Sequence, residues 1–335
     1  MTLKPMSPTE AVSLYLRDKA RDSAEATVTS HKSRLSHFVR WCETENINNL
    51  NEIDGRDLHT YKVWRVADGD LTKASEKTQI DTLRVFIRWC ESINAVTDDL
   101  HTSIRSPTLS DDDARDEYVT SDEADAILHR LNKYDYASTK HTYAVLLWHC
   151  GLRVGACRSL DLRDVKTDSD ALQTHHRPDT DTPLKNQSKG ERYVALSDDA
   201  ATVIQDYIAD RRADVTDDYD RQPLLTTRYG RPHIETLRKW SYGLTRPCTY
   251  GECPHERDPD ECDAARDQTV AYECPSTLSP HPWRRGAITH WLSQDVPAQA
   301  VADRFNVSPD VIAVHYDERT ERDKMEQRRK YLDNI

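Results

Sequence analysis

"PHPWRRGAITHWL", residues 280–292, places a histidine and an arginine three positions apart where a helical pattern begins. At about 100° per residue, His281 and Arg284 lie about 60° apart and therefore on one side of the helix. The first turn also presents unpaired backbone N–H groups and the positive end of the helix dipole. This stretch therefore offers an imidazole, a forked guanidinium and an electropositive helix end to one anion, and phosphate suits that combination. Alone, such a pair is more often a solvated surface turn, so other segments must support the interpretation.

Length and composition indicate a soluble protein with two domains. The chain has 335 residues, of which 37% are hydrophobic and 31% charged, enough for two cores. It contains no run of eighteen apolar residues, so we expect no transmembrane helix and no contact with a membrane. The N-terminal "MTLKPMSPTEAV" lacks the apolar core of a signal peptide. We therefore expect a cytoplasmic protein.

The charge balance is acidic. The chain carries 40 Asp, 18 Glu, 32 Arg and only 14 Lys, for a net charge of -12. An excess of Asp with few Lys resembles proteins of salt-accumulating, halophilic archaea, although an ordinary acidic surface is the alternative. This balance argues against a DNA-binding domain that relies on overall positive charge. Any nucleic-acid site must therefore rest on a local group of residues.

The first domain is predicted over residues 1–107 and is entirely helical. Ser7 with Glu10 predicts a capping box at the start of the first helix. The near-repeats "HFVRWCE" (37–43) and "VFIRWCE" (85–91) predict two helices with similar core faces. They do not indicate a repeat array, because no third copy follows. Residues 108–118, with three consecutive Asp and no periodicity, are predicted to be a linker.

The second domain, residues 119–335, is predicted to be mainly helical with a small β-sheet. Thr120 or Ser121 caps its first helix. The segments "ALQTHHRP" and "ERYVALS" have the composition of strands, and they flank a polar turn around "KNQSKG". Further apolar helical patterns follow up to residue 332.

Several reactive residues occur in a suggestive order. "HCGLRVGACRSLDL" places Arg153 just after a glycine at a helix junction, and Lys185 and Lys189 lie near the predicted turn. The His281–Arg284 pair follows, and Tyr316 stands at the end of a short helical segment, "SPDVIAVHYDERTERDK".

This order resembles the tyrosine recombinase (phage integrase) family, and specifically its haloarchaeal, XerC/D-like branch. The resemblance covers most of the chain and implies a helical SAM-like core-binding domain followed by a tyrosine recombinase (DNA breaking–rejoining) catalytic domain. It implies the following catalytic residues: Arg153 as the first arginine, Lys185 or Lys189 as the hairpin lysine, His281 and Arg284 as the HxxR box, and Tyr316 as the nucleophile. We favour Lys185, because "TPLKN" is expected at the end of the first strand.

The resemblance implies site-specific recombination, such as DNA integration, through a 3′-phosphotyrosyl intermediate. It implies double-stranded DNA as the partner, self-association on paired DNA sites, and no cofactor or metal for catalysis. Two positions depart from the family pattern: Ala156 replaces a usual acidic residue, and Val307 replaces a usual His or Trp nine positions before the tyrosine. The alternative is therefore a catalytically weakened, recombinase-derived DNA-binding or regulatory protein.

A cysteine-rich insertion at 248–274 interrupts the catalytic domain. This loop is rich in Pro, Gly and Asp, and its four thiols suit a closed tetrahedral zinc site. The predicted ligands are Cys248, Cys253, Cys262 and Cys274, with His255 as a possible replacement for one of them. Free thiols or a disulfide pair are the alternatives. With four protein ligands the zinc would be structural.

Overall fold

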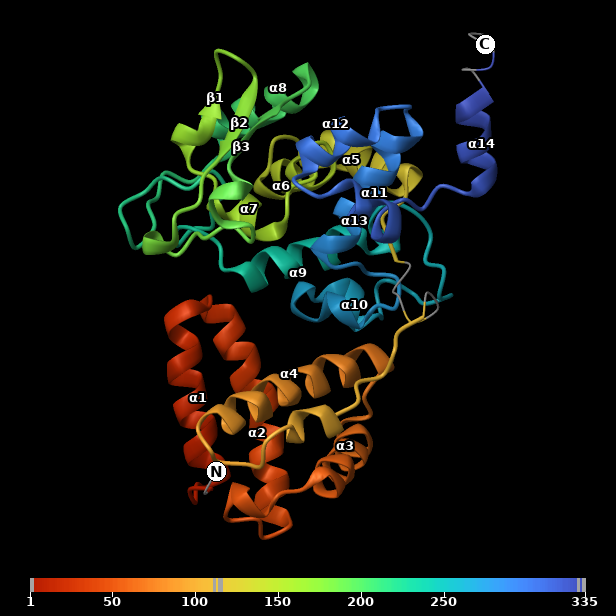
Figure 1. Cartoon of the computed structure of the whole chain (residues 1–335). Helices are drawn as coiled ribbons and strands as arrows, with labels where there is room; N and C mark the ends of the chain where they lie inside the picture. The colour runs from red at the N-terminus through yellow and green to blue at the C-terminus, as the bar shows by residue number, and fades with distance from the viewer. Residues whose placement is uncertain (1–2, 111–112, 114–116, 330–331, 333–335) are drawn as a thin grey trace. The chain divides into compact units, whose positions relative to one another are not determined.

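The computed structural model describes residues 3–110, 113, 117–329 and 332 (Figure 1). The chain divides into two compact units, Met1–Asp116 and Glu117–Ile335, and each has its own hydrophobic core. The predicted fold class, mainly helical with a small sheet, is confirmed. The predicted linker, 108–118, falls in part outside the described residues.

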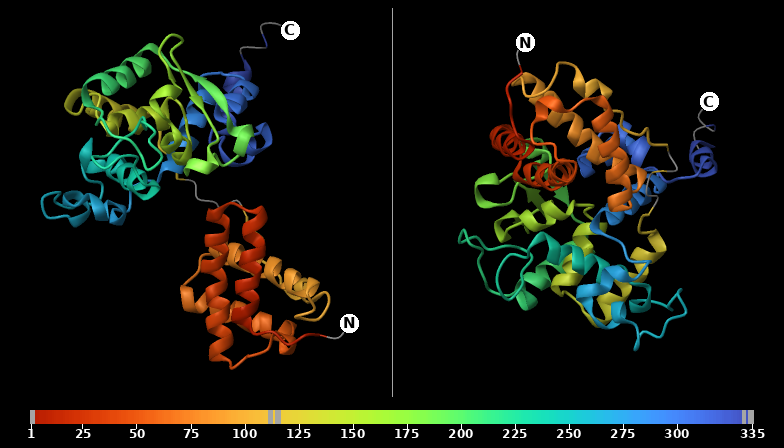
Figure 2. Two further views of the ribbon diagram at one scale, coloured as in Figure 1. Left: turned by 90° about the vertical axis from the view of Figure 1, so that its left-hand side faces the viewer. Right: turned by 90° about the horizontal axis from the view of Figure 1, so that it is seen from below.

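The first unit is a helical bundle. Its longer helices are α1 (Pro8–Asp22), α2 (Glu25–Thr44), α3 (Gly55–Gly69) and α4 (Lys73–Ser92), and α1 and α2 run side by side (Figure 2). The Ser7 side chain caps α1 by accepting a hydrogen bond from the Glu10 N–H. The two near-repeats lie on α2 and α4, where the Phe38 and Phe86 rings meet edge to face at 5.9 Å. The repeated sequence therefore supplies two faces of one core.

The second unit packs its helices around α6. These helices are α5 (Ser121–Tyr134), α6 (Thr139–Trp148), α7 (Val154–Ser159), α8 (Asp198–Asp206), α9 (Ile234–Thr245), α10 (Asp263–Arg266), α11 (Pro280–Ser293), α12 (Ala298–Phe305), α13 (Pro309–His315) and α14 (Glu321–Arg329). Thr120 caps α5 in a capping box with Glu123. Helix α6 is buried on all sides because α5, α7, α8, α9 and α11 contact it.

A small antiparallel sheet lies at one side of this unit. Its strands are β1 (Val165–Lys166), β2 (Ala171–Thr174) and β3 (Arg192–Ala195), in the order β1-β2-β3, with Leu172 opposite Val194. The two predicted strands are present but short, and β1 was not predicted. The connection 175–191 is a long loop with two 3-10 turns, so Lys185 lies within this loop and not at the end of a strand. The expected strand position of Lys185 was wrong, because the segment after β2 folds back through side-chain contacts described below.

Helix α11 passes very close to the backbone at the start of the second unit. The Val119 N–H donates to the Pro282 carbonyl at 3.2 Å. A Cβ atom on Gly286 would lie 1.8 Å from the Val119 oxygen and 3.0 Å from Trp148 Cζ3, whereas a Cβ on Gly155 in α7 would meet no atom within 4 Å. Gly286 is therefore required for close packing, and Gly155 is not.

These two glycines give a matched test of the packing. Gly286→Ala should lower the free energy of unfolding by about 1–3 kcal/mol, because the new methyl group meets a backbone carbonyl. Gly155→Ala should raise it by about 0.5–1 kcal/mol, because alanine favours a helix over glycine. Urea unfolding followed by circular dichroism measures both changes. Equal stability of Gly286→Ala and wild type would contradict the described approach of α11 to Val119.

Candidate active site

Arg284 is held in the core of the second unit by backbone carbonyl groups. Its side chain is 1% exposed, and its guanidinium donates to the Gly151 carbonyl at 2.7 Å and to the Phe305 carbonyl. Gly151 adopts a left-handed φ of +56°, and a Cβ there would lie 1.9 Å from the Phe305 ring. Gly151, two positions before Arg153, therefore allows both the left-handed turn and the close approach of Phe305. The Phe305 ring lies 5.7 Å from the Arg284 guanidinium.

Two further guanidinium groups lie near Arg284. Arg153 precedes α7, and both of its terminal nitrogens donate to the Asn306 carbonyl at 3.4 Å. Arg192 on β3, which the sequence did not single out, donates to the Arg304 carbonyl at 2.8 Å. Burial lowers the pKa of Arg284, and the positive charges of Arg153 and Arg192 lower it further. Burial and the neighbouring Arg153 likewise lower the pKa of Arg192 to about 10.

Among the described residues, no carboxylate pairs with these three arginines. Within the described part of the chain, Arg153, Arg192 and Arg284 interact with carbonyl oxygens, with one another, and with tyrosine or cysteine side chains. Burying positive charge without a counter-ion is unfavourable. An anion bound between these guanidinium groups would offset that cost, and phosphate matches their forked geometry.

Tyr316 and His281 lie at the same place. Tyr316 follows α13, is 7% exposed, and accepts a hydrogen bond at its carbonyl from Thr289 of α11 at 2.7 Å. Its ring meets the His281 ring edge to face at 5.7 Å, and the Arg284 guanidinium hydrogen-bonds its side chain. Partial burial of the imidazole lowers the pKa of His281, with further contributions from the nearby cations, Lys185 among them. The lowered pKa favours the uncharged form of the imidazole, and the residue is exposed to solvent.

The structure thus brings the five predicted catalytic residues into one region. Lys185 is exposed on the loop 175–191, close enough for its charge to act on His281. Ala156 is buried in α7, and Val307 packs against the core as an apolar side chain. Neither departure from the family pattern therefore leaves a polar group in its place.

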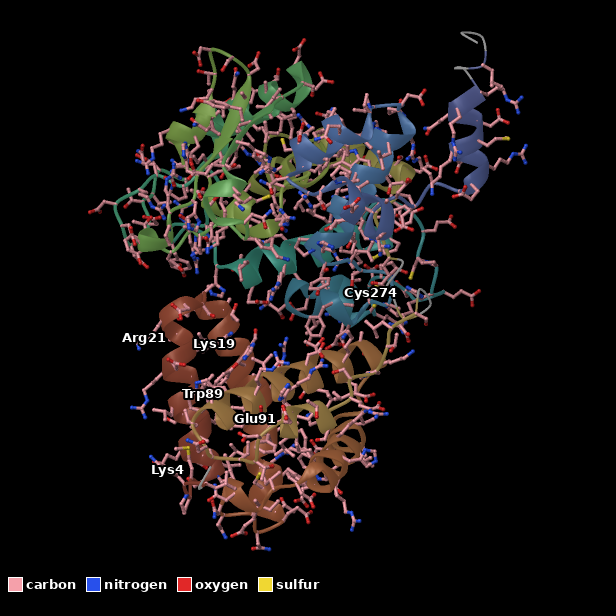
Figure 3. All side chains as sticks on the ribbon, in the orientation of Figure 1. Lys4, Lys19, Arg21, Trp89, Glu91 and Cys274 are labelled. Carbon is pink, nitrogen blue, oxygen red and sulfur yellow. The ribbon has the colours of Figure 1, made fainter. Side chains whose placement is uncertain are left out.

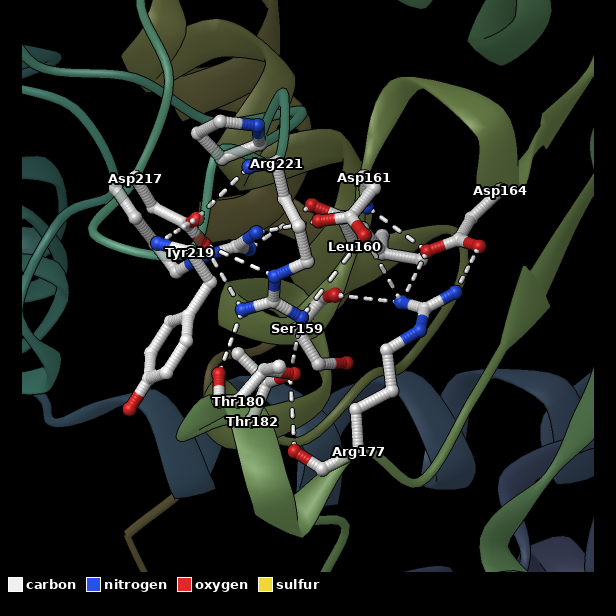
Figure 4. Close-up of polar contacts among 12 residues, drawn as sticks. Ser159, Leu160, Asp161, Asp164, Arg177, Thr180, Thr182, Asp217, Tyr219 and Arg221 are labelled. Carbon is white, nitrogen blue, oxygen red and sulfur yellow. Dashed lines mark hydrogen bonds and ion pairs between the residues drawn. The ribbon is translucent and has the colours of Figure 1, made fainter.

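An ion-pair network fixes the base of the loop 175–191, which carries Lys185 and is called the lysine loop below (Figure 4). Arg177 at the start of the loop forms a two-pronged pair with Asp164, one prong at 2.8 Å. Arg221 donates to the Thr182 hydroxyl at 2.8 Å and to the Thr180 carbonyl at 2.7 Å, and it also pairs with Asp217. Burial would raise the pKa of Asp217, but its hydrogen bonds, first among them that from Arg231, bring the pKa down to about 2.

The four cysteines of the insertion line one small pocket beside α10, together with His255 (Figure 3 labels Cys274). All four are free thiols. Burial raises the pKa of the Cys248 thiol, and the neighbouring Cys253 and Cys274 raise it further. Within the described ranges, no three His, Cys, Asp or Glu side chains are placed to hold a metal ion, so the structure gives the predicted zinc site no support.

Comparison with known proteins decides the family. The phage integrase family matches residues 117–233, and the phage integrase N-terminal SAM-like domain matches residues 14–92. The chain belongs to the phage integrase family. The matched segments include Arg153 and Lys185 but end before His281, so the last three site residues of this phage integrase rest on their motifs and on the geometry above.

Two solved integrase structures share the fold of this chain. The Tn1549 transposon integrase in complex with a circular intermediate DNA is 13% identical, with a TM-score of 0.70 and coverage of 98% of this chain and 100% of that chain. A lambda integrase dimer bound to a COC′ core site is 13% identical, with a TM-score of 0.64 and coverage of 94% and 78%. The N-terminal domain of a phage integrase/site-specific recombinase from Haloarcula marismortui is 31% identical over 31% of this chain and 99% of that chain, with a TM-score of 0.30.

Two other comparisons are negative. A search among curated protein sequences found no match. In the part of the chain that the structure describes, no helix is both long enough and apolar enough to cross a membrane.

Proposed function

We propose that this phage integrase is a site-specific DNA recombinase that cuts and rejoins DNA strands through Tyr316. The observation that carries the proposal is a group of three guanidiniums, one buried and two half-buried, that has no carboxylate partner among the described residues and lies beside Tyr316 and His281. A DNA phosphate is the anion that such a group suits, even though the whole chain carries a net charge of -12. Local geometry, and not overall charge, therefore supports DNA as the substrate.

Each residue has a role in one balanced step. Arg153 and Arg284 bind the non-bridging oxygens of the scissile phosphate and stabilise the negative charge that grows there. His281, whose lowered pKa favours the uncharged imidazole, accepts the proton of the Tyr316 hydroxyl, whose oxygen attacks phosphorus. The bond from phosphorus to the 5′ oxygen breaks, and Lys185 donates a proton to that oxygen. The resulting 3′-phosphotyrosyl ester keeps the phosphodiester energy, so the 5′-hydroxyl of a second strand can reverse the step without a catalytic metal or cofactor.

Double-stranded DNA and a second copy of the chain are the proposed partners. Two structural relatives are, by their descriptions, an integrase with a circular intermediate DNA and an integrase dimer on a core site. By analogy, this chain would assemble on paired sites and act in the cytoplasm. The second candidate is a catalytically weakened DNA-binding protein, which the apolar Ala156 and Val307 favour.

A suicide DNA substrate, nicked so that cleavage cannot be reversed, tests Tyr316 directly. Wild type should form a protein–DNA band that survives denaturation, and Tyr316→Phe should abolish it because only the attacking hydroxyl is lost. Arg284→Lys keeps a charge but loses the guanidinium fork, and should slow adduct formation about 10²–10³-fold. Tyr134→Phe makes the same change at a side chain that is 68% exposed in α5, and should behave as wild type.

Binding measured in parallel separates the two candidates. Tight binding of wild type to its site without any adduct would support the weakened protein. An adduct that persists in Tyr316→Phe would show that another nucleophile acts, and the site assignment would then be wrong.

We also propose that Cys248, Cys253, Cys262 and Cys274 bind one structural zinc. The four free thiols line one pocket in a loop that buries few side chains of its own, namely Ala264, Ala271 and Cys274. Thiolates suit zinc, and binding would release their protons and order the loop that leads into α11. His255 could substitute for one cysteine, although it now hydrogen-bonds Ser276 at 2.9 Å.

Elemental analysis of the purified protein should give about one zinc per chain, the content of a single closed site. Cys248→Ser should lower that content and the melting temperature. Cys42→Ala removes a buried thiol of the first unit and should leave the zinc content unchanged. Metal-free wild type whose melting temperature does not respond to chelators would refute the zinc site.

We infer further that the protein comes from a halophilic archaeon and folds best in concentrated salt. The excess of Asp over Lys supports this, because closely spaced carboxylates repel one another until salt screens them. Thermal unfolding followed by circular dichroism in rising KCl should show a melting temperature that increases up to molar salt. A melting temperature independent of KCl would leave an ordinary acidic surface.

A further inference from the structure

Asn306 connects the lysine loop to the first arginine of the site. It follows α12 in the left-handed conformation, with φ of 49° and ψ of 63°. Its amide oxygen accepts from the Asn186 side chain, and its amide nitrogen donates to the Lys189 carbonyl. Its backbone carbonyl accepts hydrogen bonds from both terminal nitrogens of Arg153. One residue therefore contacts the chain on both sides of the loop tip and also holds Arg153.

The loop tip has few other restraints. Residues 185–189 are all exposed, and a short 3-10 turn at Gln187–Gly190 is their only regular structure within the described residues. The ion pairs of Arg177 and Arg221 act at the base of the loop. An exposed lysine on an unrestrained tip would sample many positions, and ordering it for reaction would cost conformational entropy.

The left-handed backbone does not by itself explain an asparagine. Glycine adopts this conformation with less strain than any other residue, so glycine would satisfy the helix end equally well. Asparagine adds an amide that accepts and donates at the same time, and here both capacities are used on the lysine loop. The Asn306 side chain therefore links the end of α12 to the lysine loop, a contact that a glycine could not make.

We propose that Asn306 is a positioning residue that holds Lys185 where it can protonate the leaving 5′ oxygen. The amide fixes Asn186, the residue next to Lys185, while the Asn306 carbonyl keeps Arg153 beside the phosphate position. Asn306 thereby contacts both the residue next to the proposed proton donor and the arginine proposed to bind the phosphate. This inference rests on the proposed recombinase function.

Two variants of Asn306 isolate its amide. Asn306→Gly keeps the left-handed backbone and removes the amide, and Asn306→Asp keeps an acceptor but loses the donor to the Lys189 carbonyl. Both should slow formation of the Tyr316 adduct by about 10–10²-fold, the effect of a small misplacement of a reacting group. DNA binding and the melting temperature of Asn306→Gly should stay close to those of wild type.

A changed leaving group distinguishes positioning of Lys185 from general damage. A substrate with sulfur in place of the bridging 5′ oxygen leaves as a thiolate, whose conjugate acid has a pKa of about 8.5 and which needs no proton. On this substrate Asn306→Gly and Lys185→Ala should both regain near wild-type rates, whereas Arg284→Ala should stay slow. If Asn306→Gly is equally slow on both substrates, its role is structural and the inference is wrong.

A double-variant cycle tests the contact itself. Asn186→Ala removes the partner of the Asn306 amide oxygen, so the double variant should be slowed by less than the product of the two single effects. Multiplicative effects would contradict a shared contact. Wild type is measured in the same assay: if it forms no adduct, the proposed function fails, and if it does but Asn306→Gly cleaves at the same rate, only this inference fails.

Discussion

Three guanidinium groups, which pair with no carboxylate in the part of the chain that the structure describes, set the conditions for the rest of the second unit. Arg153, Arg192 and Arg284 are kept in place by carbonyl oxygens, which accept hydrogen bonds without cancelling the positive charge. This matters because the chain has many carboxylates, and any one of them in this place would compete with a phosphate. The buried Ala156, near Arg153, adds no charge. The acidic composition and the cationic site are therefore compatible.

Local spacing made part of this site predictable. His281 and Arg284 share one helix, so their common side follows from helix geometry alone. Tyr316 and Arg153 were found from their order along the chain and from the resemblance to a family. The roles of these residues remain proposals, whereas the helical fold with a small sheet, expected from hydrophobic periodicity, is present.

Long-range contacts account for what the sequence did not reveal. Asn186 and Asn306 are 120 positions apart, and the pairing of their amides leaves no local pattern. In the lysine loop, the sequence predicts a polar turn between two strands, because "KNQSKG" has the polar, glycine-containing composition of a turn. The path of this loop is set instead by Arg177 and Arg221, whose partners include Asp164 and Thr182 in other segments. Arginine suits these positions because its planar fork can bind several acceptors at once, which a lysine ammonium does less well.

Helix α11 also fixes the spacing between Arg284 and the anchor of Tyr316. It carries Arg284 near its start, and five positions later Thr289 holds the carbonyl of Tyr316. At about 1.5 Å of rise and 100° of rotation per residue, the offset between the two anchor points is fixed by the helix itself. In the proposed reaction, the distance from the Tyr316 oxygen to the bound phosphate would therefore depend on this rigid helix, even though Tyr316 belongs to a different segment. Gaining or losing a single residue between these anchors would turn one away from the other, so the length of this stretch is under as strict a constraint as the identity of its reactive side chains.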